Sequence, residues 1–93
     1  MNNTGRHKEI MQILGNAERL NIVLELSMDK MTAKQVAEQH YIDKKTAWTT
    51  LKRMEDAQII KGEIKGKNKF YYTTPGFFRK FARQIVEDLE VKK

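Results

Sequence analysis

The sequence has 93 residues and a mass of 10.9 kDa, enough for one small domain and too few for two. Hydrophobic residues make up 40% of the chain and charged residues 32%, with a single proline, which excludes a disordered or collagen-like chain. There is no cysteine, so disulfides, thiolate metal ligands and cysteine nucleophiles are excluded, and no apolar run is long enough for a membrane span or a secretory signal. We therefore expect one cytoplasmic domain over residues 1–93 that makes no membrane contact.

The positive charge is concentrated in one stretch. The chain has 18 lysines and arginines against 12 acidic residues, a net charge of +6, and residues 44–69 alone carry a net charge of +5. A charge run in isolation more often indicates a solvated surface than a binding site, so a nucleic-acid site needs structural support. The basic residues of this stretch are Lys44, Lys45, Lys52, Arg53, Lys61, Lys65, Lys67 and Lys69.

Two helices are predicted before residue 27. A hydrophobic period of 3.6 runs over residues 6–14, where Gly15 is a stop signal, and again over residues 17–26, where Asn16 is a typical N-cap. The inner stripes are expected to hold Ile10, Ile13 and Leu14 in the first helix and Leu20, Ile22, Val23, Leu24 and Leu26 in the second.

Residues 32–58 predict a helix-turn-helix. Thr32 and Gln35 form a capping-box pattern that begins a short helix, and Asp43 is a suitable N-cap for the helix that follows a tight connection at Tyr41. Two helices joined by about three residues are typical of this motif. The expected inner residues are Val36, Ala37 and His40 in the first helix and Ala47, Leu51, Met54 and Ala57 in the second.

A β-hairpin and a last helix complete the chain. From residue 59 the hydrophobic period changes to 2, and Gly66 with Asn68 supplies turn residues, so residues 59–73 predict a hairpin with a basic tip. Thr74 is expected to cap, and Pro75 to begin, an amphipathic helix over residues 75–90.

The order of these elements, α-α-α-α-β-β-α, indicates a mainly α domain with a β-hairpin wing, the winged helix-turn-helix fold. The second helix of the motif and the wing lie together in such a fold, so the positive charge would form one surface. Small threonines among the lysines favour close approach to a major groove over a merely solvated helix face. The expected DNA-binding residues are Lys44, Lys45, Thr46, Trp48, Thr49, Lys52, Arg53, Lys65, Lys67 and Lys69.

Short stretches of the sequence resemble the ArsR/SmtB family of winged-helix repressors. Residues 14–22, LGNAERLNI, resemble the family's opening motif, and residues 51–60, LKRMEDAQII, resemble its run into the wing. Val36-Ala37 stands where the family has Leu-Ala, and Tyr71-Tyr72 matches the aromatic pair of its second wing strand. The resemblance covers residues 10–73 and implies a DNA-binding homodimer.

The family's metal ligands are not matched. Thr32 and Lys34 stand where some metal sensors of the family have two cysteines, and the last helix has no histidine. Carboxylates alone are poor zinc ligands, and an isolated histidine such as His7 or His40 is more often a packing residue. We therefore expect no metal site and no cofactor, although the last helix carries the carboxylates Glu87, Asp88 and Glu90.

The resemblance implies dimerisation through the first and last helices. The last helix is more apolar than one interior contact requires, which favours a second partner surface. The alternative is that the same residues complete the core of the monomer. The expected interface residues are Ile10, Ile13, Phe77, Phe78, Phe81, Ile85 and Leu89.

The function predicted from the sequence is sequence-specific binding of double-stranded DNA, as a dimeric transcriptional repressor that does not sense metal. One alternative is a plasmid or phage maintenance protein that binds centromere, origin or transfer repeats, and another is a winged-helix protein-interaction module. An enzyme is disfavoured, because one serine, two histidines and no cysteine offer no catalytic triad. The sequence leaves the target DNA and any small-molecule effector open.

Overall fold

The computed structural model describes residues 4–91, except for the side chains of residues 4–6, 88, 90 and 91. The Asp88 and Glu90 carboxyl groups therefore lie outside the described residues. The described part contains α1 (Thr4–Leu14), α2 (Ala17–Leu26), α3 (Ala33–His40), α4 (Lys44–Asp56), β1 (Ile60–Lys65), β2 (Asn68–Thr73) and α5 (Phe77–Val91). This order confirms the predicted α-α-α-α-β-β-α arrangement.

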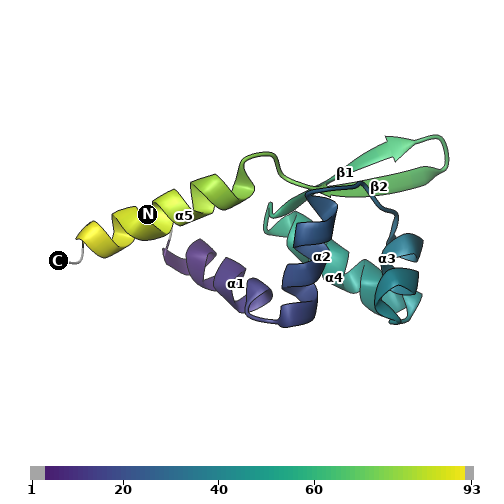
Figure 1. The fold of residues 1–93 in the computed structure, drawn as a ribbon, viewed down its shortest axis with the longest axis horizontal. Coiled ribbons are helices and arrows are strands. Elements are labelled where there is room, and N and C mark those ends of the chain that lie inside the picture. The colour runs from purple at the N-terminus through teal and green to yellow at the C-terminus, as the bar shows by residue number, and fades with distance from the viewer. Residues whose placement is uncertain (1–3, 92–93) are drawn as a thin grey trace.

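The elements divide the molecule into two ends joined by α2. Figure 1 shows α3, α4 and the hairpin at one end, and α5 leaving the body with α1 beneath it at the other. The principal-axis extents are 48 × 23 × 23 Å, because α5 continues past the rest of the chain. The α3–α4 pair and the base of the hairpin therefore lie far from the end of α5.

The core lies where α2, α4 and the hairpin meet. Ile22, Val23 and Leu26 of α2 are buried, as predicted, but Leu24 is 44% exposed and its predicted inward position is wrong. The buried stripe of α2 faces α1 and β2, which leaves the Leu24 side of the helix uncovered. The other buried core residues are Ile10, Ile13, Val36, Ala37, Ala47, Leu51, Met54, Ala57, Ile59, Ile60, Tyr71 and Phe77.

The helix N-termini carry the caps that the sequence predicts. Asn16 Oδ1 accepts the Arg19 N–H at 3.0 Å, and Asp43 Oδ1 accepts the Thr46 N–H at 2.6 Å. Thr32 and Gln35 form the reciprocal capping box. Each cap satisfies amides that have no partner within the helix, so each fixes where its helix begins.

Helices α3 and α4 both end at a non-glycine residue in the left-handed conformation. Tyr41 has φ 54° and Gln58 has φ 65°. The next residue then donates its N–H back to the helix, from Ile42 to Ala37 O at 3.1 Å and from Ile59 to Met54 O at 3.0 Å. The connection within the helix-turn-helix therefore keeps the tight geometry that glycine usually provides.

The hairpin turns through a two-residue loop and is attached to the segment before α3. Strands β1 and β2 pair antiparallel from Ile60 opposite Thr73 to Lys65 opposite Asn68. Gly66, at φ 62°, occupies the first loop position, where a type II′ turn requires a positive φ. On its other edge β2 pairs with Met31, which exchanges two backbone hydrogen bonds with Tyr71.

The last helix begins two residues later than predicted. Phe77, not Pro75, is its first residue, and Thr74 is not its cap. Pro75 and Gly76 form a turn in which Gly76 has φ 74° and the Phe77 N–H bonds to Thr74 O at 2.9 Å. Proline followed by a residue with positive φ is typical of a type II turn, and the left-handed glycine prevents the helix from starting earlier.

Candidate nucleic-acid interface

Helix α4 buries one face and exposes the other. Ala47, Leu51 and Met54 are buried at 0% exposure, which fixes the rotation of the helix about its axis. The side chains of α4 that are predicted to contact DNA are all exposed, with Lys45, Thr49, Lys52 and Arg53 opposite the buried face. The full set is Lys44, Lys45, Thr46, Trp48, Thr49, Lys52 and Arg53.

Most of the cations on this face are not neutralised by the protein itself. Within the described part of the chain, Lys44, Lys45 and Arg53 take part in no ion pair. Lys52 lies 3.7 Å from Asp56 one turn later, but both side chains are more than half exposed, and such a pair is weak. The face therefore remains electropositive.

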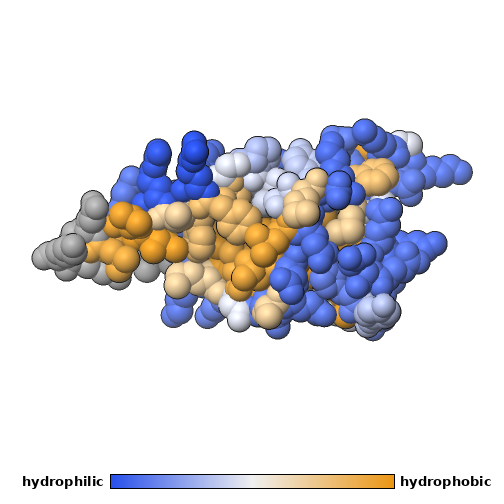
Figure 2. Space-filling model, in the orientation of Figure 1, coloured by the Kyte–Doolittle hydropathy of each residue, from blue (hydrophilic) through white to orange (hydrophobic). Residues whose placement is uncertain are grey.

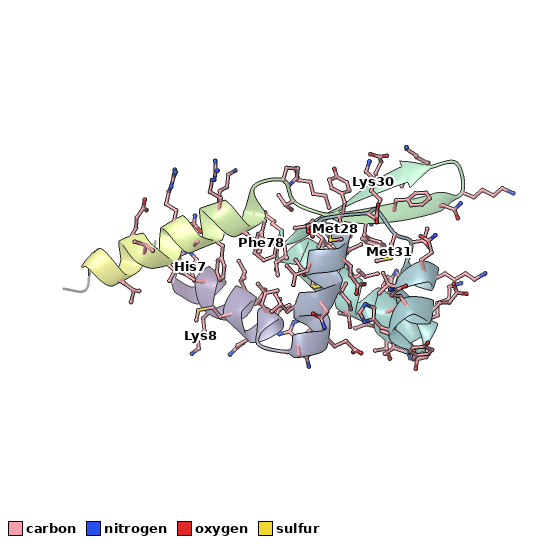
Figure 3. All side chains as sticks on the ribbon, viewed as in Figure 1. His7, Lys8, Met28, Lys30, Met31 and Phe78 are labelled. Carbon is pink, nitrogen blue, oxygen red and sulfur yellow. The ribbon has the colours of Figure 1, made fainter. Side chains whose placement is uncertain are left out.

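The wing tip adds two exposed cations, Lys65 and Lys67. Lys65 Nζ lies 3.5 Å from Glu63 Oε2, and Glu63 also accepts a hydrogen bond from Lys30 at 3.0 Å. That hydrogen bond from Lys30, with its charge, lowers the pKa of the Glu63 carboxyl group. Figure 3 shows Lys30 reaching from the segment before α3 to the hairpin, so this contact ties the wing to the helix-turn-helix.

Lys69 is not the free cation at the wing that its place in the predicted DNA-binding set implies, but forms an ion pair. Its Nζ binds Glu55 Oε1 of α4 at 2.9 Å, and this hydrogen bond raises the pKa of Lys69. The pair crosses β1 at Gly62, where an added Cβ would lie 2.2 Å from Lys69 Cε. The sequence pattern does not predict this contact, because its partners are 14 residues apart and lie on different elements. Lys69 thus braces the wing against α4.

The hydrophobic residues of the face seen in Figure 2 gather between α1 and α5. The same face is hydrophilic over α3, the start of α4 and the hairpin tip, and also along the upper edge of α5. We call the set Lys44, Lys45, Thr46, Thr49, Lys52, Arg53, Lys65 and Lys67 the basic surface.

The residues predicted for a dimer interface divide into three groups by their burial. Ile10, Ile13 and Phe77 are 3%, 0% and 7% exposed, so they belong to the core of the single chain and are withdrawn from the interface set. Phe81 and Ile85 are half-buried, and Phe81 stacks on Phe77 with 5.6 Å between ring centroids. The apolar side chains left exposed, which we call the apolar end, are Met11, Phe78, Val86 and Leu89.

Met11 and Val86 are not among the interface residues predicted from the sequence. Their exposure, 55% and 53%, depends on how α1 packs on α5, which periodicity does not reveal. His7 forms part of that packing: it points from α1 toward α5 in Figure 3 and lies 2.9 Å from Gln84 Oε1.

The polar residues considered for metal binding have structural partners. Thr32 forms the capping box, and His40 Nε2 lies 2.9 Å from Glu25 Oε1. Among the described residues no group of three or more His, Cys, Asp or Glu side chains is placed to hold a metal ion. None of the described helices is long and apolar enough to cross a membrane.

No protein-family model matches the sequence, and no curated protein matches it. Solved structures do match. One of them is the homodimeric winged helix-turn-helix DNA-binding domain of a possible ArsR-family transcriptional regulator from Mycobacterium bovis. It is 21% identical, over 91% of this chain and 81% of that chain, with a TM-score of 0.75. An ArsR-like transcriptional regulator from Rhodococcus sp. RHA1 is 16% identical, over 97% of this chain and 84% of that chain, with a TM-score of 0.81.

NolR from Sinorhizobium fredii is a third similar structure, 11% identical over 87% of this chain and 82% of that chain, with a TM-score of 0.74. At these identities the likeness is one of fold. The chain is a winged helix-turn-helix protein, and the structures it matches include regulators of the ArsR family.

Proposed function

We propose that this protein binds double-stranded DNA sequence-specifically and acts as a dimeric transcriptional regulator in the cytoplasm. The observation that carries the proposal is the exposed face of α4, on which Lys44, Lys45 and Arg53 have no acidic partner in the described chain. Such a face on the second helix of a helix-turn-helix attracts the phosphate backbone and fits the major groove.

In the proposed complex α4 lies in the major groove and the wing lies over the flanking backbone. Thr49 and Lys45 are exposed near the middle and the start of α4, where side chains of a recognition helix reach base edges. Lys65 and Lys67 at the wing tip contact phosphates, which orient the protein without reading sequence. The Lys69–Glu55 pair supports this geometry because it fixes the wing to α4.

The proposed dimer forms through the apolar end. Phe78 and Leu89 of α5 are 36% and 60% exposed, more apolar surface than a helix of a small monomer normally presents to water. The similar domain from Mycobacterium bovis is homodimeric, which supports the same assembly here. A two-fold dimer would read two half-sites ~34–36 Å apart.

We propose repression without a metal signal as the regulatory mode, since Thr32, at one of the family's metal positions, forms the capping box of α3, and Lys34, at the other, carries an ammonium group in place of a thiolate. Maintenance of a plasmid or phage through repeated sites is the alternative use of the same DNA-binding surface. Footprinting across neighbouring genomic DNA separates the two, because a single operator beside a promoter indicates regulation and an array of repeats indicates maintenance.

The roles assigned to α4 and the wing predict different mutant effects. Preferred duplexes are first selected from a random-sequence pool, and binding is measured by fluorescence anisotropy. Thr49→Ala should erode the preference for the selected duplex by about 1–3 kcal/mol, because a base contact is lost. Lys67→Ala should weaken selected and unrelated duplexes alike. Wild-type binding by both variants would show that neither element contacts DNA as proposed.

A further inference from the structure

Tyr41 is the most exposed large hydrophobic side chain in the described part of the chain, at 96%. It lies in the turn between α3 and α4, in the left-handed conformation with φ 54° and ψ 41°. A residue with a Cβ is disfavoured in this conformation, and glycine and asparagine are the residues usually found there. An aromatic residue at this position therefore requires a reason other than the backbone.

The fold uses the backbone of Tyr41 and not its ring. The left-handed turn lets the Ile42 N–H bond to Ala37 O at 3.1 Å, so that Ile42 packs against the core and Asp43 caps α4. Glycine at position 41 would make the same turn with less strain. Within the described residues the Tyr41 side chain takes part in no hydrogen bond and no aromatic contact, so its ring contributes nothing visible to the packing.

The turn that carries Tyr41 leads directly into α4, whose first residues belong to the basic surface. Tyr41 precedes Lys44 by three residues, and Lys44 and Lys45 are the exposed first residues of α4. The N-terminal part of a recognition helix enters the major groove, while the preceding helix crosses the backbone, so the turn between them faces the groove edge. Figure 1 places α3 at the end of the molecule away from α5, so a dimer formed at the apolar end leaves Tyr41 uncovered.

We propose that Tyr41 is a DNA-backbone contact that positions α4 in the groove. Its hydroxyl group donates a hydrogen bond to a phosphate oxygen at the groove edge, and its ring lies against the adjacent sugar. Tyrosine is among the side chains that contact phosphates in this way. This inference rests on the proposed function and adds a positioning residue that carries no charge.

The test compares Tyr41→Phe and Tyr41→Gly on a mixed-sequence duplex of ~30 bp, long enough for two half-sites. Tyr41→Phe should weaken binding about three- to tenfold, through loss of one hydrogen bond. Tyr41→Gly should weaken binding at least as much, while its Tm rises by about 4–8 °C as the strain is relieved. The salt dependence of binding should stay at the wild-type slope, since no charge is removed.

Gln58→Gly is the matched control, because Gln58 is the other left-handed residue and lies at the far end of α4. Its duplex affinity should stay within about twofold of wild type. Wild-type affinity in Tyr41→Gly, or a fall in affinity that accompanies a fall in Tm, would overturn the inference about Tyr41 alone. Absence of duplex binding by the wild-type protein would overturn this inference and the proposed function together.

Discussion

Asp43 shows how a single side chain positions the proposed recognition helix. Its carboxylate accepts the backbone N–H of Thr46, and this hydrogen bond lowers the pKa of Asp43 below its ordinary value of 3.8. A carboxyl group with a lowered folded-state pKa stabilises the protein above its ordinary pKa and loses that contribution as pH falls through the folded pKa. The start of α4 should therefore be sensitive to acid.

Asp43→Asn should remove this acid sensitivity and retain the cap, because asparagine caps a helix about as well as aspartate. Urea unfolding of both proteins from about pH 5 to about pH 2 measures the effect. The stability advantage of wild type over the variant should shrink as pH falls. A pH-independent gap for Asp43→Asn would contradict the role assigned to its ionised carboxylate.

At the scale of the elements, local chemistry determined which features were predictable. The caps at Asn16, Thr32 and Asp43 were correct because each depends on residues three positions apart. The start of α5 was placed too early because Pro75 suits both a first helical turn and a type II turn, and the left-handed Gly76 decides between them.

Contacts between elements were not predictable from periodicity. The Lys69–Glu55 pair joins the hairpin to α4, and Ile10, Ile13 and Phe77 are buried because they join the core cluster formed by several elements. A hydrophobic stripe shows which face of a helix is apolar, but not whether its own chain or a second copy covers that face. The exposure of the α4 cations agrees with the sequence pattern, because solvated cations need no partner within the chain, whereas their contact with DNA stays a prediction.

At the scale of the whole molecule, the proposed dimer interface and the proposed DNA-binding surface lie on different elements, so the two proposals are compatible. The apolar end lies along α1 and α5, and the basic surface lies at the opposite end of a molecule 48 Å long. A second copy bound at the apolar end therefore leaves both recognition helices exposed. The proposed dimer would also hold two copies of α4 in one molecule, and linked binding elements have a higher affinity for paired DNA sites.

Leu89→Ser should weaken the dimer at least tenfold, ~1.4 kcal/mol, because each copy loses an apolar side chain from the interface. Sedimentation equilibrium measures the dissociation constant. Arg83→Ser on the same helix is the matched control, since it shortens a polar side chain outside the apolar end and should leave the dimer unchanged. A wild-type protein that is monomeric at high concentration, or equal effects of the two substitutions, would contradict dimerisation through this face.

The central claim is that the cations of α4 contact the DNA backbone. The salt dependence of duplex binding tests this claim most directly. Each phosphate neutralised contributes about 0.9 to the slope of log affinity against log salt. A variant with Lys44, Lys45 and Arg53 all changed to alanine should bind a selected ~30-bp duplex more weakly, with a slope reduced by about 2 to 3 per protomer. The control changes Arg79, Lys80 and Arg83 of α5 to alanine, which removes the same charge from a helix outside the basic surface, and should keep the wild-type slope. Equal slopes for the wild type and the α4 variant, or equal losses in the two triple variants, would contradict the account.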